Sequence, residues 1–149
     1  MATSANMGFV SYETACQRHF DDAEFLMAGV RTASAAQLYG FCAECGVKWL
    51  LIRCGAPTGA DGSVLSPWKV HIEKLALARM INDIETLTCG RTNGHYVAMI
   101  RSITAFVDWS IDHRYCKADR SPLSFPRWRA AARDVRRMIE QAMLDGVPL

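Results

Sequence analysis

Apolar residues return every three or four positions through most of this chain, and this spacing constrains the fold more than any other feature of the sequence. It predicts helices that each bury one face. Five segments show the spacing, namely residues 11–28, 34–54, 67–88, 96–107 and 126–144. No stretch alternates between apolar and polar residues for long enough to predict a strand. We therefore expect an all-α fold, an up-and-down bundle of about five helices.

Local signals predict where several of these helices begin. Ser34 followed by Gln37 has the form of a capping box and predicts the start of the second helix. Ser66 followed by Pro67 predicts the start of the third, because proline at the first helical position loses no hydrogen bond. Residues 55–66 are rich in Gly, Pro and Asp, and residues 110–125 show no helical period. Both of these segments are predicted to be loops.

The composition is typical of a folded protein with one domain. A chain of 149 residues has the length of one domain, so residues 1–149 are expected to share a single core. Half of the residues are apolar and 21% are charged, which excludes a disordered chain, and a formal net charge of +2 is too small to indicate a partner. The N-terminus does not resemble a secretory signal, and no run approaches the ~18 apolar residues of a spanning helix. A cytoplasmic protein with no membrane partner is expected.

The stretch FCAECGVKWLL allows three interpretations: half of a zinc site, a redox dithiol or one turn of a buried helix. A helix that begins at Ser34 places Cys42 and Cys45 about two turns past its N-terminus, too far for the amide groups there to stabilise a redox thiolate. No second pair of ligands has a suitable spacing, so no metal site is predicted and all six cysteines are expected to be free thiols. Glu44 and Lys48 lie four residues apart, so we expect them to pair on one helix face and to support a binding cleft.

The segment RHFDDAEFLMAGVRTASAAQLYGFCAECGVKWLL, residues 18–51, resembles the first two helices of the HEPN family, and DWSIDHRY, residues 108–115, resembles a motif that some bacterial branches carry after the fourth helix. The resemblance implies a HEPN-like helical bundle that forms homodimers and acts in toxin–antitoxin, phage-defence or RNA-processing systems. Many members are metal-independent ribonucleases with an Arg followed, after four to six residues, by a His. That signature is absent here, and the nearest approach is RTNGH, with three residues between Arg91 and His95.

Arg91 and His95 are therefore the candidate catalytic residues. Cleavage of RNA without a metal requires a group that removes a proton from the 2′-hydroxyl, a group that protonates the leaving oxygen, and positive charge on the phosphorane. Arg91 is suited to hold the phosphate and His95 to act as acid or base, and a second copy in a dimer supplies another such group. The alternative is an ordinary turn followed by a surface histidine. No cofactor is predicted.

Two further sets of residues are candidate binding groups. In the segment after the fourth helix, His113 and Arg114 point in opposite directions if the backbone is extended, so Arg114 and Tyr115 are expected to anchor this segment, with Arg114 paired to Glu44. The alternative places Arg114 in an interface pocket with Lys48. The last helix turns four arginines outward, and these form either a nucleic-acid-binding face or an ordinary solvated surface: Arg129, Arg133, Arg136 and Arg137.

Three functions are consistent with these patterns. The first is a HEPN-like homodimeric module of a bacterial defence or toxin–antitoxin system that is directed at RNA and is a candidate metal-independent endoribonuclease. The second is a nuclease-dead helical adaptor that binds a partner such as a nucleotidyltransferase or an antitoxin. The third is a nucleotide-binding bundle without hydrolysis.

Overall fold

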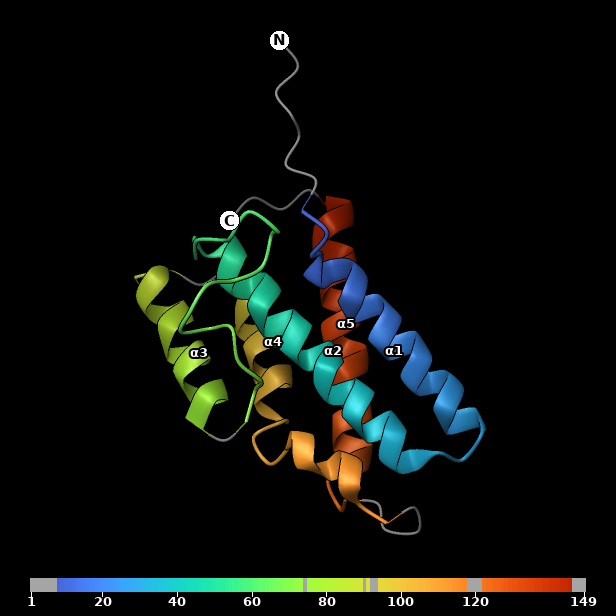
Figure 1. Ribbon diagram of the computed structural model, residues 1–149. Coiled ribbons are helices and arrows are strands. Elements are labelled where there is room, and N and C mark those ends of the chain that lie inside the picture. Colours follow the sequence, from blue (N-terminus) through green and yellow to red (C-terminus); the bar gives the residue numbers. More distant parts are fainter. Residues whose placement is uncertain (1–7, 74, 90, 92–93, 118–121, 146–149) are drawn as a thin grey trace.

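The computed structural model describes residues 8–73, 75–89, 91, 94–117 and 122–145, and these residues form a helical bundle (Figure 1). The helices are α1 (Tyr12–Ala28), α2 (Thr32–Arg53), α3 (Leu75–Leu87), α4 (Gly94–Thr104) and α5 (Phe125–Asp145), with a short 3₁₀ helix η1 (Ile111–Tyr115) between α4 and α5. In these residues β pairing is limited to one isolated bridge between Thr58 and Val64. The prediction of an all-α fold with about five helices is confirmed.

The direction of the helices differs from a strict up-and-down order at one point. Residues 54–73 return along the bundle without forming a helix, so α2 and α3 run in the same direction (Figure 1). No described helix has both the length and the apolar character that crossing a membrane requires.

Helix α2 is the centre of the bundle. It packs against α1, α5, η1, α3 and α4, and 14 of its 22 residues are buried. A helix that is buried around most of its circumference lies inside a protein and not on its surface. Helices α1 and α5 cover one side of α2, and α3 and α4 lie towards the other side (Figure 1).

Glycine residues allow other elements to approach α2 closely. A Cβ atom at Gly40 would lie 1.9 Å from Cε2 of Trp109, whose indole nitrogen donates a hydrogen bond to the carbonyl oxygen of Ala36 at 3.1 Å. A Cβ atom at Gly46 would lie 2.5 Å from Cγ1 of Val135 on α5. Since packed atoms do not approach so closely, both contacts depend on glycine.

The start of α2 was predicted at the wrong residue. The helix begins at Thr32 without a side-chain cap, and Ser34 is exposed within its first turn. Val30 has a φ of 58°, and the Arg31 amide donates to the carbonyl of Leu26 at 2.9 Å, so the turn after α1 is tight and α2 follows at once.

The predicted start of α3 at Pro67 is also wrong, because α3 begins at Leu75. Side chains from elsewhere hold residues 67–73 in a non-helical path. The Trp68 indole nitrogen donates to the Asp83 carboxylate at 2.8 Å, and the Ile72 amide donates to Glu44 at 3.3 Å. The loop predicted for residues 55–66 is therefore present and continues to residue 73.

The ends of α1 and α5 agree with their predicted positions to within one residue. Ser11 caps α1 by accepting a hydrogen bond from the Thr14 amide at 3.3 Å. The fourth helix, predicted over 96–107, spans Gly94–Thr104. The predicted loop 110–125 contains η1, which is capped by Ser110, whose hydroxyl accepts from the Asp112 amide at 3.1 Å.

Candidate functional site

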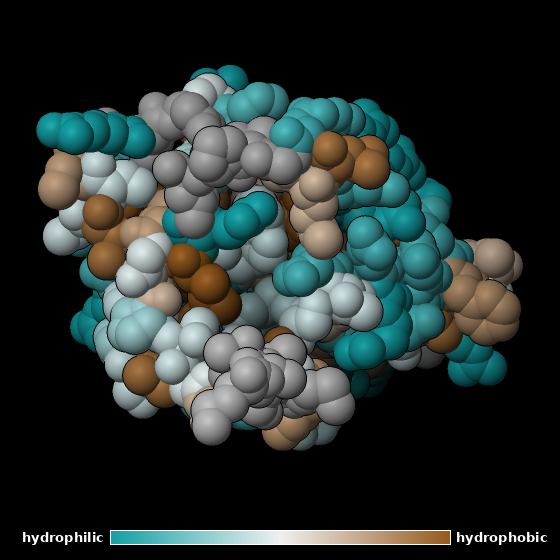
Figure 2. Space-filling model, turned by 90° about the horizontal axis from the view of Figure 1, so that it is seen from above, coloured by the Kyte–Doolittle hydropathy of each residue, from teal (hydrophilic) through white to brown (hydrophobic). Residues whose placement is uncertain are grey.

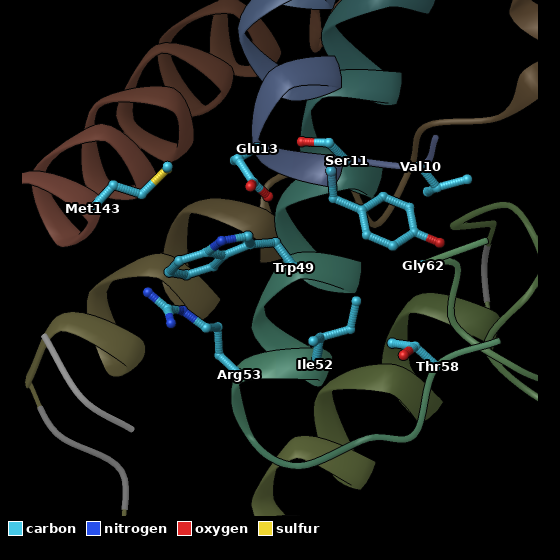
Figure 3. A pocket seen from close by; sticks show the side chains of 10 residues that line it. Val10, Ser11, Glu13, Trp49, Ile52, Arg53, Thr58, Gly62 and Met143 are labelled. Atoms are coloured by element: carbon cyan, nitrogen blue, oxygen red, sulfur yellow. The ribbon is translucent and has the colours of Figure 1, made fainter. Parts of the chain in front are cut away.

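Two pockets lie at the end of the bundle where α2 terminates, and both are lined by Arg53. The junction pocket, between the ends of α2 and α3 and the start of α4, has a volume of about 370 Å³ and is lined by Arg53, Cys54, Gly55, Leu87, Thr88, Arg91 and Tyr96. The α1–α2 pocket has a volume of about 460 Å³ and is lined by Val10, Ser11, Tyr12, Glu13, Trp49, Ile52, Arg53, Thr58, Gly62 and Met143 (Figure 3). Figure 2 views the molecule from above and shows hydrophobic and hydrophilic residues mixed on this face.

The side chain of Arg53 is held in place by α2 itself. Its guanidinium carbon lies 5.0 Å from the centre of the Trp49 ring, one turn earlier in the helix. The Nε atom is buried and has no hydrogen-bond partner in the described part of the chain. Stacking on an aromatic ring fixes the plane of the guanidinium group, which leaves its terminal nitrogens to bind a ligand.

Arg91 reaches the same pocket from the connection between α3 and α4. Its backbone amide donates to the carbonyl of Thr88 at 2.9 Å, and its side chain is exposed. No carboxylate of the described residues lies within 4.0 Å of the guanidinium of either Arg53 or Arg91. Two guanidinium groups that share a pocket without a counter-charge favour binding of an anion.

Tyr96, on the first turn of α4, forms the apolar side of the junction pocket. It is 6% exposed, and burial raises the pKa of its hydroxyl, with the Cys54 thiol acting in the same direction.

The two predicted catalytic residues lie in different surroundings. Arg91 lines the junction pocket, whereas His95 lies on the exposed first turn of α4 and is not among the residues that line it. Thr92 and Asn93, between them, lie outside the described residues. Sequence reasoning missed Arg53. It is the last residue of a mostly apolar helix. Only the packing of α2 against α3 and α4 places it beside Arg91 in the lining of the junction pocket.

Glu44 and Lys48 form an ion pair within α2, with 2.9 Å between Nζ and Oε1. The other carboxylate oxygen of Glu44 lies 3.0 Å from Nδ1 of His71 and accepts from the Ile72 amide at 3.3 Å. Lys48 is 7% exposed, and neither member of the pair lines one of the two pockets. Through Glu44, the pair fastens the 71–72 segment to α2.

The predicted contact between Arg114 and Glu44 is wrong, because Glu44 binds Lys48, His71 and the Ile72 amide instead. The alternative, an interface pocket that holds Arg114 and Lys48, stays a prediction. Arg114 lies over the ring of its neighbour Tyr115, at 4.8 Å, and both side chains are exposed. The prediction assumed an extended segment, but residues 111–115 form η1, which turns these side chains towards solvent.

His113 has a structural position in η1. Its Nδ1 accepts a hydrogen bond from the Ser110 amide at 3.2 Å, and its ring lies 5.2 Å from that of Trp128 on α5.

The arginines of α5 fall into two groups. Arg129 donates two hydrogen bonds to Glu24 on α1, at 2.9 and 2.8 Å, and Arg136 lies 3.4 Å from Asp21. Arg133 and Arg137 are exposed and have no carboxylate within ion-pair distance in the described part of α1–α5. Two of the four arginines predicted to form a nucleic-acid face, Arg129 and Arg136, therefore pair with carboxylates of α1.

The thiols of α2 are buried in the core. The sulfur atoms of Cys42 and Cys16 lie 3.3 Å apart, and Cys42 also contacts the carbonyl oxygen of Ala132 at 3.7 Å. The hydrogen bond with Cys16 and burial raise the pKa of Cys42, and burial raises the pKa of Cys45 to about 12. Cys42 and Cys45 neither bind each other nor belong to a cluster that could hold a metal ion in the described residues.

The whole chain was also compared with known proteins. Comparisons with models of protein families, with curated proteins and with solved structures found no match.

Proposed function

We propose that this chain is an RNA-directed module in which Arg53 and Arg91 bind a phosphate group of RNA in the junction pocket. The observation that carries the proposal is that both arginines line one pocket to which the described residues contribute no carboxylate. A guanidinium group presents its donors in a planar fork that matches the oxygens of a phosphate. Phosphate contacts of this kind supply most of the affinity of sequence-independent nucleic-acid binding.

A row of exposed groups extends from the junction pocket along α4. His95, Ala98 and Arg101 are spaced by three residues and are exposed, so they share one face of the helix. Arg101 and Arg137 line a further pocket between α4 and α5, to which Asp134 also contributes. From residue 95 to residue 101 a helix rises about 9 Å, a distance that one or two nucleotides of an extended strand can span. This row offers a path for the RNA backbone beyond the first phosphate.

The resemblance of residues 18–51 and 108–115 to the HEPN family supports RNA as the anion and suggests a homodimer in a bacterial defence or toxin–antitoxin system. In the endoribonuclease version of this proposal, Arg91 holds the scissile phosphate and His95 acts as acid or base. One observation favours the alternative, an adaptor that binds RNA or a protein partner without cleavage, since His95 does not line the pocket that holds Arg91.

RNA binding is tested by fluorescence anisotropy with a labelled single-stranded oligonucleotide. We expect Arg53→Ala and Arg91→Ala each to weaken binding by about tenfold or more, because each removes a charge-assisted phosphate contact. The matched control is Arg31→Ala, which removes the same charge from an exposed site in the turn between α1 and α2. Binding by both pocket variants at the native affinity contradicts the proposal.

Cleavage is tested separately by incubating the protein with RNA in the presence of EDTA. Products that disappear in His95→Ala and in Arg91→Ala support the endoribonuclease version. Tight binding without products from the native protein supports the adaptor.

A further inference from the structure

The α1–α2 pocket carries a second inference, about a different ligand, and it shares only Arg53 with the proposed RNA site. Four separate parts of the chain line it: the first turn of α1 with the residues before it, the last turns of α2, the loop around Thr58 and Gly62, and the end of α5 at Met143 (Figure 3). Its volume of about 460 Å³ is within the range of pockets that bind small molecules.

Two opposite charges face this pocket without pairing. Glu13 enters from α1 and Arg53 from α2, and in Figure 3 the indole of Trp49 lies between them. The two side chains do not form an ion pair with each other, and the described residues provide neither of them with another charged partner. A ligand that carries both an ammonium group and a carboxylate would satisfy the two charges together.

The rest of the lining is mainly apolar. Val10, Ile52 and Met143 lie around the two charged groups, and Met143 is 48% exposed. An apolar group of a ligand that covers one of these side chains is removed from water together with it, which favours binding. A simple anion is a poorer match, because the carboxylate of Glu13 would repel it.

We propose that the α1–α2 pocket binds an amino acid with an apolar side chain. Glu13 accepts hydrogen bonds from the ammonium group, the terminal nitrogens of Arg53 donate to the carboxylate, and the apolar side chain lies against Ile52, between Val10 at one end of the pocket and Met143 at the other (Figure 3). The stacking of Arg53 on Trp49, at 5.0 Å, orients the guanidinium before the ligand arrives.

The test is isothermal titration calorimetry of the native protein with L-leucine, L-methionine and L-phenylalanine, each compared with its N-acetyl and its amide derivative. We expect at least one free amino acid to bind, and we expect blocking either charged end to weaken binding by about tenfold or more, since each end makes a charge-assisted contact. Absence of binding by all three amino acids at millimolar concentration overturns the proposal. Equal binding by the blocked derivatives also overturns it. These comparisons use the native protein, so they do not depend on the folding of a variant.

Three substitutions separate this proposal from RNA binding. Glu13→Gln should lose amino-acid binding by about tenfold and keep RNA binding, Arg91→Ala should do the reverse, and Arg53→Ala should weaken both. Circular dichroism checks that each variant is folded. Native amino-acid affinity in folded Glu13→Gln contradicts the assigned role of Glu13, whatever the outcome for RNA.

Discussion

The α1–α5 interface and the junction pocket use the same residue type for different purposes. At the interface, Arg129 and Arg136 bind carboxylates of α1, so their charges are neutralised within the bundle. At the junction, Arg53 and Arg91 line a pocket to which the described residues contribute no carboxylate. The number of arginines in a segment therefore does not indicate where an anion binds. The difference between the regions lies in which arginines already have a partner, and substitutions can test it.

The largest effect on stability is expected in the core of the bundle, where Gly40 of α2 contacts Trp109. Gly40→Ala places a methyl group 1.9 Å from the rigid indole of Trp109, so Trp109 or the backbone must move. We expect a loss of about 3 kcal/mol in the free energy of unfolding, measured by urea denaturation. The control is Gly94→Ala at the start of α4, where an added Cβ meets no atom within 4 Å and stability should change by less than about 1 kcal/mol. A Gly40→Ala protein as stable as the native one would contradict the claim that the contact with Trp109 requires glycine at this position.

The next largest effect is expected at the interface between α1 and α5. Glu24→Ala leaves the guanidinium of Arg129 and the buried hydroxyl of Tyr39 without the carboxylate that both now bind. Loss of these hydrogen bonds should lower the free energy of unfolding by about 2 kcal/mol. RNA affinity should stay at the native value, because Glu24 lines neither pocket. A large loss of RNA affinity in folded Glu24→Ala would remove the distinction between the two regions.

The same interface should give the protein an acid-sensitive contribution to stability. Hydrogen bonding by Arg129 lowers the pKa of Glu24 from its ordinary 4.5 to about 2. Because the folded-state pKa is below the unfolded-state value, the stabilisation is complete above pH 4.5 and is lost as the pH falls towards 2. Urea denaturation at several pH values should show the native protein losing its advantage over Glu24→Gln across this window. A constant difference between the two proteins from pH 6 to about pH 3 would contradict the assignment.

A smaller effect on stability is expected at the junction. Arg53 has no ion pair among the described residues and contacts the body of the protein chiefly through Trp49. Loss of a half-buried cation–π contact costs about 1 kcal/mol, so Arg53→Ala should unfold only slightly below the native midpoint. Thermal denaturation checks this. A strongly destabilised variant would show that Arg53 belongs to the bundle and not to a binding site.

Helix content could be predicted from the sequence where local signals determine it. The apolar period located α1 and α5 to within one residue, because both helices pack one continuous face against α2. The start of α3 could not be predicted in this way. Residues 67–73 are held by Asp83 and Glu44, and hydrogen bonds between residues so far apart leave no local pattern.

The candidate site was predicted only in part for a similar reason. Arg91 was identified from the short motif that contains it, but Arg53 has no motif and belongs to the site only through the packing of α2 against α3 and α4. The arginines of α5 gave the opposite error. Their spacing predicted an open basic face, whereas the carboxylates that bind Arg129 and Arg136 lie more than 100 residues earlier in the chain.

Joint binding of an RNA phosphate by Arg53 and Arg91 is what distinguishes the junction from the α1–α5 interface in this proposal. Its most direct test is the salt dependence of RNA binding by the native protein and by the double variant Arg53→Ala/Arg91→Ala. We expect the double variant to bind more weakly and the slope of log affinity against log salt concentration to decrease by about one to two units, as fewer counterions are released. An unchanged affinity and slope in the folded double variant would contradict the claim.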